Sequence, residues 1–228
     1  MQNNEDLLTE ARIKIFLGEF GSGKTELAVN YALRLKKQGY NTAIIDIDLL
    51  KPYFRTRENR ALLEDQGVEV VAPEQKFSQA ALPVLPNDVT RLLYQQDCQL
   101  VMDVGGGESS IALGQFHQRF AENPYIALLV VNTCRPFTAN AVDIVDAFHR
   151  IEQSSRLKIT GLVSNTNIAG ETTAAHVLEG LAVVEEAAAA LSLPIRWVVV
   201  PEWLSAEVEV PYPVFVLRPY TMYPWMGE

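Results

Sequence analysis

One stretch constrains the fold of this chain more than any other: residues 18–25 read GEFGSGKT. Its residues fill every fixed position of the pattern G-x-x-x-x-G-K-[ST], namely Gly18, Gly21, Gly23, Lys24 and Thr25. An apolar run at 12–18 precedes the stretch, and at 24–37 apolar residues recur every four positions, which predicts a helix. A strand, a glycine-rich turn and a helix in this order form a cradle of backbone N–H groups that binds phosphate.

The rest of the sequence alternates between apolar strand-like runs and helical patterns. Strands are expected at 12–18, 41–48, 68–73, 99–104, 125–132, 158–165 and 195–201. Helices are expected at 24–37, 57–66, 87–96, 111–120, 138–153 and 172–191. This rhythm predicts a three-layer, doubly wound α/β fold with a mostly parallel sheet of about seven to eight strands. With the phosphate loop after its first strand, the expected fold is of the P-loop nucleoside triphosphatase type.

Length and composition favour one domain. The 228 residues are 48% hydrophobic and 21% charged, which is ordinary for a globular domain, and no linker-like segment divides them. We therefore expect a single nucleotide-binding domain over 1–228 with a core at about 12–204, and a surface excursion at 74–87. Residues 205–228 are rich in proline and aromatic residues, so this tail is expected to pack over the sheet edge or to contact a partner.

Charge and cysteine content exclude several classes of function. A net charge of -9 repels polyanions, so we expect no nucleic-acid partner. The N-terminus lacks a signal-peptide pattern and the longest apolar runs have strand length, which predicts a cytoplasmic protein that does not enter a membrane. Cys98 and Cys134 lie in or beside apolar runs without a C-x-x-C motif, so we expect buried thiols and no iron–sulfur cluster.

The phosphate loop predicts a nucleotide and a metal ion at one site. Lys24 is expected to reach the β- and γ-phosphates as a catalytic group, and the Thr25 hydroxyl to ligate Mg²⁺. Asp103 ends an apolar run before three glycines, where its carboxylate would hold Mg²⁺ through a water while the glycine loop moves with the γ-phosphate. The other residues of the loop and the first one after it complete the expected nucleotide-binding set: Glu19, Phe20, Ser22 and Glu26.

A pair of carboxylates follows the second apolar run. Asp46 and Asp48 are separated by Ile47, so alternation along a strand places both on one face. Two carboxylates at the carboxyl edge of the sheet, near a metal-bound triphosphate, suit metal binding and the orientation of water.

Together these motifs resemble the MinD/ParA-like P-loop ATPases, a group that includes the CobQ/CobB-type nucleotide-binding domain. The resemblance covers about residues 12–204: the phosphate loop, the D-x-D strand followed by a proline, the later D-x-G-G and an Asn that ends the sixth strand. It implies that Asp48 positions the attacking water and that Asp46 supports the metal shell. It also implies that Asn165 contacts the adenine edge, that Pro201 and Glu202 pack against the base, and that two copies meet across the nucleotide face.

The identity of the base follows from what surrounds Asn165. Guanine-specific relatives use N-K-x-D, in which the Asp pairs with donors of guanine, whereas here Asn165 is followed by Thr166, Asn167 and Ile168. ATP is therefore favoured over GTP, with ADP as the product.

Glu19 departs from the resemblance, because MinD/ParA-like proteins usually have a lysine there that reaches the partner's phosphates. A carboxylate cannot neutralise charge that develops on phosphoryl transfer, so another cation would have to replace the lysine. The segment after Asp48 is rich in cations, and its Arg55 or Arg57 could act as an arginine finger. The alternative is a solvated helix start in which these arginines pair with neighbouring glutamates.

These features favour a Mg²⁺–ATP-binding protein with slow ATP hydrolysis that acts as a nucleotide-dependent switch on a partner protein. Two alternatives stay open. One is an ATP-dependent kinase or ligase acting on a small molecule, and the other is a nucleotide-binding module without catalysis.

Overall fold

The computed structural model describes residues 8–47, 59–71 and 87–220. Its strands are β1 (Ile13–Leu17), β2 (Thr42–Asp46), β3 (Glu69–Val71), β4 (Gln99–Val104), β5 (Tyr125–Val131), β6 (Gly161–Ser164), β7 (Ile195–Pro201) and β8 (Val214–Leu217). The α-helices are α2 (Lys24–Lys37), α3 (Arg60–Asp65), α4 (Asn87–Tyr94), α5 (Glu108–Gly114), α6 (His117–Glu122), α7 (Ala141–Ser155) and α8 (Ala174–Leu191). Short 3₁₀ turns are η2 (Pro136–Thr138), η3 (Ala169–Glu171) and η4 (Glu202–Leu204).

The eight strands form one parallel sheet in the order β3-β2-β4-β1-β5-β6-β7-β8. The first strand lies inside the sheet, between β4 and β5, and its last residue, Leu17, is in register with Val104 and Leu129. The order of strands along the sheet reverses here, and ligands of open α/β sheets bind outside the carboxyl ends of the strands at such a point. The phosphate loop starts one residue later, so it lies at this switch point.

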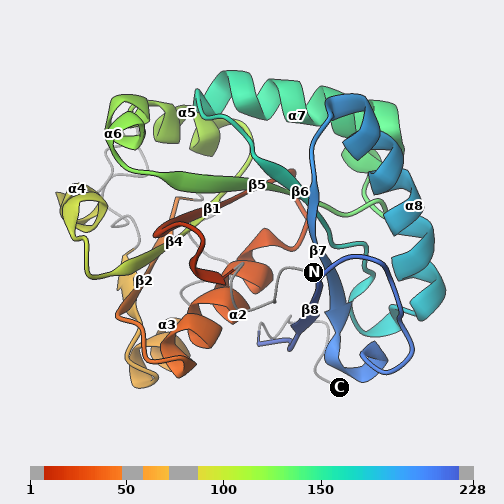
Figure 1. Ribbon diagram of the computed structural model, residues 1–228, viewed down its shortest axis with the longest axis horizontal. Coiled ribbons are helices and arrows are strands. Elements are labelled where there is room, and N and C mark those ends of the chain that lie inside the picture. The colour runs from red at the N-terminus through yellow and green to blue at the C-terminus, as the bar shows by residue number, and fades with distance from the viewer. Residues whose placement is uncertain (1–7, 48–58, 72–86, 221–228) are drawn as a thin grey trace.

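Helices cover both faces of the sheet, as Figure 1 shows. On one face α4, α5, α7 and α8 pack on the odd-numbered residues of β1, and on the other α2 and α3 pack on the face that includes Phe16. Because both faces are covered, strands such as YIALLVV are apolar almost throughout. The predicted three-layer α/β fold is therefore confirmed.

Two predicted elements differ from the structure. The helix expected at 111–120 is two helices, α5 and α6, with a break after Gly114. A Cβ atom at Gly114 would lie 2.9 Å from the carbonyl oxygen of Ser154, so α5 ends where it packs closely against α7. The strand expected at 158–165 forms ladder pairs only from Gly161, which is in register with Leu128 of β5.

The segment predicted as a tail contributes the eighth strand. Residues Val214–Leu217 extend the sheet at its edge, parallel to β7, and Phe215 is buried. The Phe215 ring stacks on Tyr31 of α2 and meets Trp197 of β7 edge-on, with centroid separations of 6.4 and 5.9 Å. This strand was not predicted from the sequence VPYPVFVLRP, because its apolar run is short and bounded by prolines. Among the described helices, none has the length and apolar character needed to cross a bilayer.

Candidate functional site

The phosphate loop is shaped by close contacts at two glycines. A Cβ atom at Gly18 would lie 2.6 Å from the carbonyl oxygen of Val130, so only glycine lets the loop leave β1 this close to β5. Gly23 has φ of 83° and immediately precedes α2, a conformation that favours glycine. Lys24 and Thr25 are buried in the first turn of α2, beside the positive end of the helix dipole.

Side chains from the ends of two other strands hold the loop carbonyls. The amide nitrogen of Asn165, which follows β6, donates to the carbonyl oxygen of Ser22 at 2.7 Å. The carbonyl oxygen of Gly21 accepts from Asn132 Nδ2, after β5, at 3.3 Å and from Arg135 Nε at 3.2 Å. In a trans peptide the N–H points opposite to the C=O. Because Asn165 binds the carbonyl oxygen of Ser22, the N–H of Gly23 in the same peptide points away from Asn165.

These contacts of Asn132, Arg135 and Asn165, here called the clamp, add a role to Asn165. The resemblance implies that its amide contacts the edge of the base, and in the structure its amide nitrogen supports the phosphate loop. Asn132 was not predicted at all, although it directly follows β5 as Asn165 directly follows β6, and that equivalent position was the signal for it. Asn132 Nδ2 also donates to the carbonyl oxygen of Asn167 at 3.0 Å, so the loops after β5 and β6 are tied together.

The carboxylates expected to bind metal lie on neighbouring strands. Asp46, the last residue of β2, is in register with Asp103 of β4, and Asp103 is in register with Phe16. Residues in register on parallel strands share a face, and Phe16 lies on the face covered by α2. Asp103 is only 1% exposed, whereas Asp46 is half-buried. Two carboxylates and the Thr25 hydroxyl are hard oxygen donors of the kind that suits Mg²⁺. The remaining predicted metal ligand, Asp48, lies outside the described residues.

Glu19 forms an ion pair within the chain. Its Oε1 accepts from Arg150 Nη2 of α7 at 2.8 Å. Its other carboxylate oxygen faces Gly106 in the loop after β4, where a Cβ atom would lie 3.5 Å away. Glu19 therefore connects the rim of the phosphate loop to α7 and to the glycine loop that follows Asp103. The proposed finger residues Arg55 and Arg57 lie outside the described residues, whereas Arg135 contacts the phosphate loop directly.

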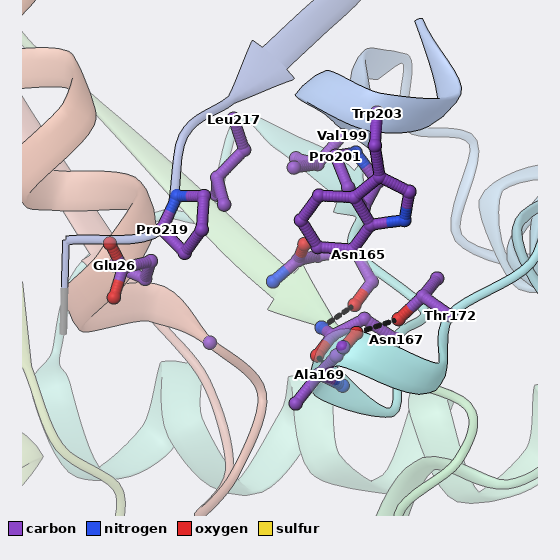
Figure 2. Close-up of a pocket in the computed structure, with 12 residues that line it drawn as sticks. Glu26, Asn165, Asn167, Ala169, Thr172, Val199, Pro201, Trp203, Leu217 and Pro219 are labelled. Atoms are coloured by element: carbon purple, nitrogen blue, oxygen red, sulfur yellow. Dashed lines mark hydrogen bonds between the residues drawn. The ribbon is translucent and has the colours of Figure 1, made fainter. Parts of the chain in front are cut away.

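A cavity of about 170 Å³ opens beside the loop, at the side of Gly23 that faces β6 and β7. Figure 2 shows Trp203 and Pro201 on one side, Asn167 and Ala169 on another, and Glu26, Leu217 and Pro219 on a third. Pro201, which the resemblance implies to pack against the base, lines this cavity, and Glu202 begins η4 directly after it. Trp203, which is 45% exposed, was missed, and an aromatic residue two positions after the strand-ending proline was the available signal.

The third side of the cavity belongs to residues 214–220, here called the C-terminal strap. Three α2 side chains spaced four apart bind its backbone. Glu26 Oε1 accepts from the Tyr220 N–H at 2.5 Å, and Arg34 Nη2 donates to the Val216 carbonyl oxygen at 3.0 Å. Between them, the Asn30 amide bonds both the N–H and the carbonyl oxygen of Arg218, at 2.9 and 2.8 Å. Partial burial against the strap lowers the pKa of the Arg34 guanidinium, whose carbon lies 4.1 Å from the Phe215 ring centroid.

The two cysteines differ in burial. Cys98 is buried, as predicted, and burial raises the pKa of its thiol. Cys134 is only half-buried, because it lies in the turn after β5 rather than in the strand. Across the described ranges, no cluster of three or more His, Cys, Asp and Glu side chains has metal-binding geometry.

Comparison with known proteins supports the fold. No protein-family model matches the sequence, and no curated protein matches it. Among solved structures, chloroplast FtsY from Physcomitrella patens is similar with a TM-score of 0.55, 17% identity and coverage of 84% of this chain and 63% of that one. FtsY from Mycoplasma mycoides is similar with a TM-score of 0.53 and 16% identity, over 84% of this chain and 64% of that one. The 54 kDa protein of the signal recognition particle from Aeropyrum pernix, solved in complex with GDP, has a TM-score of 0.50 and 19% identity. The match covers 80% of this chain and 40% of that one.

The chain thus spans less than two thirds of the length of each of these proteins. At such low identity the likeness concerns the fold alone. The fold and the phosphate loop together define an α/β protein of the P-loop nucleoside triphosphatase type.

Proposed function

We propose that the protein binds a Mg²⁺–nucleoside triphosphate, hydrolyses it slowly and acts as a nucleotide-dependent switch on a partner protein. One observation carries the proposal. The phosphate loop is preformed, with Lys24 and Thr25 buried at the start of α2 and with its carbonyls clamped by Asn132, Arg135 and Asn165. A loop held in its binding shape loses little conformational entropy when phosphate binds.

The residues of the site divide into two roles. Lys24 would contact the β- and γ-phosphates, while Thr25, Asp46 and Asp103 would hold Mg²⁺. When bound, the metal would neutralise charge on the phosphate oxygens. Asp48 is proposed to orient the attacking water, as the resemblance to MinD/ParA-like ATPases implies. Slow rather than fast turnover is proposed because Glu19, the residue at the position of the usual lysine, is paired with Arg150.

ATP is the proposed nucleotide. The segment after β6 lacks the Lys and Asp of N-K-x-D, which leaves guanine without its acidic partner. The signal recognition particle protein with a similar fold was solved with GDP, so ATP and GTP are both compared in the experiment.

The switch proposal rests on the loop after β4. Glycines 105–107 separate Asp103 from α5, and Gly106 lies against Glu19, which in turn is paired with α7. A change at the γ-phosphate can therefore reach α5 and α7, two helices on the same face of the sheet, where a partner protein could detect it. A cytoplasmic location and pairing of two copies across the nucleotide face belong to the same proposal.

Calorimetric titration with ATP, ADP and GTP in Mg²⁺, combined with a phosphate-release assay on the same sample, tests the proposal. Wild-type protein is expected to bind ATP and release phosphate slowly. Lys24→Ala should lose most of the affinity, whereas Lys37→Ala, at the opposite end of α2, should bind as the wild type does. Absence of binding by any of the three nucleotides would refute the proposed function.

A further inference from the structure

The cavity beside the phosphate loop has a wall that the sequence motifs do not account for. We infer that Trp203 and the C-terminal strap form a slot that selects purine nucleotides by stacking rather than by hydrogen bonds to the base edge. The inference deepens the proposed function and rests on it, because it names the class of base that the same site takes.

The side-chain amide nitrogens and the hydroxyl that line the cavity are engaged within the protein. Asn165 Nδ2 donates to Ser22, and Asn167 Nδ2 donates to the carbonyl oxygen of Asn165 at 2.8 Å. The Thr172 hydroxyl donates to the carbonyl oxygen of Ala169 at 2.6 Å and accepts from the N–H of Ile168 at 3.0 Å. A base that accepted hydrogen bonds from these donors would have to break the bonds that they already make. Apolar contact with its faces requires no such loss.

The apolar part of the lining comes from two elements on opposite sides. Trp203 lies on η4, whose neighbouring residues Pro201 and Leu204 are buried and fix its position. Leu217 and Pro219 belong to the strap and face the indole across the cavity, as Figure 2 shows. A large aromatic side chain that stays 45% exposed beside a phosphate loop is suited to stack on a flat ring.

The strap is fixed relative to the phosphate loop by α2. The helix begins with Lys24 and Thr25, and its next two turns bind the strap through Glu26, Asn30 and Arg34. One rigid helix therefore sets the distance between the phosphate-binding end of the site and the wall of the slot. Inside the cavity, Ala169 has φ of 55°, a left-handed conformation that is strained for alanine, and such strain is typical of ligand-binding segments.

Stacking has a predictable selectivity. It strengthens with the size of the ring system and depends little on edge groups, so the stacking contribution should be similar for ATP and GTP and larger than for CTP. Removing a stacking aromatic typically weakens binding about fivefold to 150-fold per base. Inorganic tripolyphosphate contains no base, so its binding should be independent of Trp203.

The test is calorimetric titration of wild type, Trp203→Ala, Trp203→Phe and Tyr40→Ala with ATP, GTP, CTP and tripolyphosphate in Mg²⁺. Trp203→Ala should weaken ATP and GTP at least fivefold and leave tripolyphosphate unchanged, and Trp203→Phe should recover most of the loss. Tyr40→Ala removes a partly exposed aromatic residue near the far end of α2 and should match the wild type. Circular dichroism verifies that each variant is folded.

Other outcomes separate the two proposals. Wild-type protein that binds ATP while Trp203→Ala binds it equally well would overturn the slot and leave the proposed function intact. The same holds if Trp203→Ala weakens tripolyphosphate as much as ATP, because the effect would then not come from the base. If the wild type binds neither nucleotide nor tripolyphosphate, the proposed function fails and the slot fails with it.

Discussion

Gly23 and Asn165 are packed so closely that each determines what the other position can hold. A Cβ atom at Gly23 would lie 2.3 Å from Asn165 Nδ2, the atom that donates to the Ser22 carbonyl oxygen. The glycine is therefore required twice, once for its φ of 83° and once for the space that the clamp occupies. Pattern matching in the sequence finds the glycine but not the asparagine that contacts it.

Substitution of Gly23 separates these two requirements. Gly23→Ala should lower the free energy of unfolding by more than the about 1–2 kcal/mol of a left-handed alanine, because the clamp must also move. Gly39→Ala is the matched control, since Gly39 has φ of 90° but no atom within 4 Å of an added Cβ. Urea denaturation of both variants measures the difference. Equal losses in the two variants would contradict a structural role for the clamp.

Lys14 is a second residue with an unusual environment. It lies on β1 with its side chain buried on the α2 face, and its ammonium group donates to the carbonyl oxygens of Ala11 and Leu8 at 2.7 and 3.4 Å. Burial lowers the pKa of this lysine to about 7 from its ordinary value of 10.5. Two carbonyls do not replace the water that a charged ammonium loses, so the charged form is less stable in the folded chain than in water.

The shift predicts how stability depends on pH. Between about pH 7 and 10.5 the unfolded chain holds the proton of Lys14 and the folded chain does not, so stability rises with pH across this window. The contribution is at most about 1.4 kcal/mol per pH unit, and it becomes constant below the folded pKa. Lys14→Met should remove this slope from urea midpoints measured between pH 7 and 10, whereas Lys37→Met should retain it. A wild-type slope in Lys14→Met would show that other groups are responsible.

At the scale of elements, α2 serves as the common support of the phosphate loop and the C-terminal strap. The strap is an edge strand and its continuation, and β8 pairs only with β7 among the described strands. Its attachment to α2 uses backbone atoms of the strap. The side chains of the strap therefore give no sequence signal from which this contact could be predicted. The i, i+4, i+8 spacing of Glu26, Asn30 and Arg34 is visible in the sequence only as ordinary polar positions of a helix.

Asn30 is the central anchor of this attachment. Asn30→Ala removes both hydrogen bonds to Arg218, so the strap should open more often while α2 stays folded. Hydrogen exchange followed by mass spectrometry should show faster exchange in peptides over 214–220, corresponding to a loss of about 1–3 kcal/mol of local stability. Peptides over β5 should exchange as in the wild type. Unchanged exchange in the strap would mean that the β7–β8 ladder alone holds it.

The sequence predicted elements whose signal is local and missed those that depend on distant contacts. Seven of the strands and the helix after the phosphate loop follow from periodicity, because each buries a continuous face. The β8 strand was missed because its apolar run is short, and its burial depends on Tyr31 and Trp197 from elsewhere in the chain. In the site, Lys24 and Thr25 are recognisable from a local motif, whereas the support role of Asn165 depends on a contact 143 positions away.

At the scale of the whole molecule, the sheet joins parts of the site that the chain keeps far apart. The carboxyl ends of β1, β2, β4, β5, β6 and β7 supply the loop, the carboxylates, the clamp and the slot. A ligand that touches all of these should stabilise the entire fold, since each group is held by a different strand. Stability measurements therefore report on ligand binding even where turnover is too slow to follow.

The last prediction uses this coupling. With Mg²⁺–ATP at about 100 times its dissociation constant, binding should add about 2.7 kcal/mol to the free energy of unfolding. For a chain of this size, that corresponds to a rise in Tm of roughly 5–11 °C. Lys24→Ala should lose the rise because the phosphate contacts disappear, and Trp203→Ala should keep it with tripolyphosphate while losing part of it with ATP. Differential scanning fluorimetry measures all of these. An equal rise in Lys24→Ala and wild type would contradict the proposed contact of Lys24 with the phosphates, because its side chain would then contribute nothing to binding.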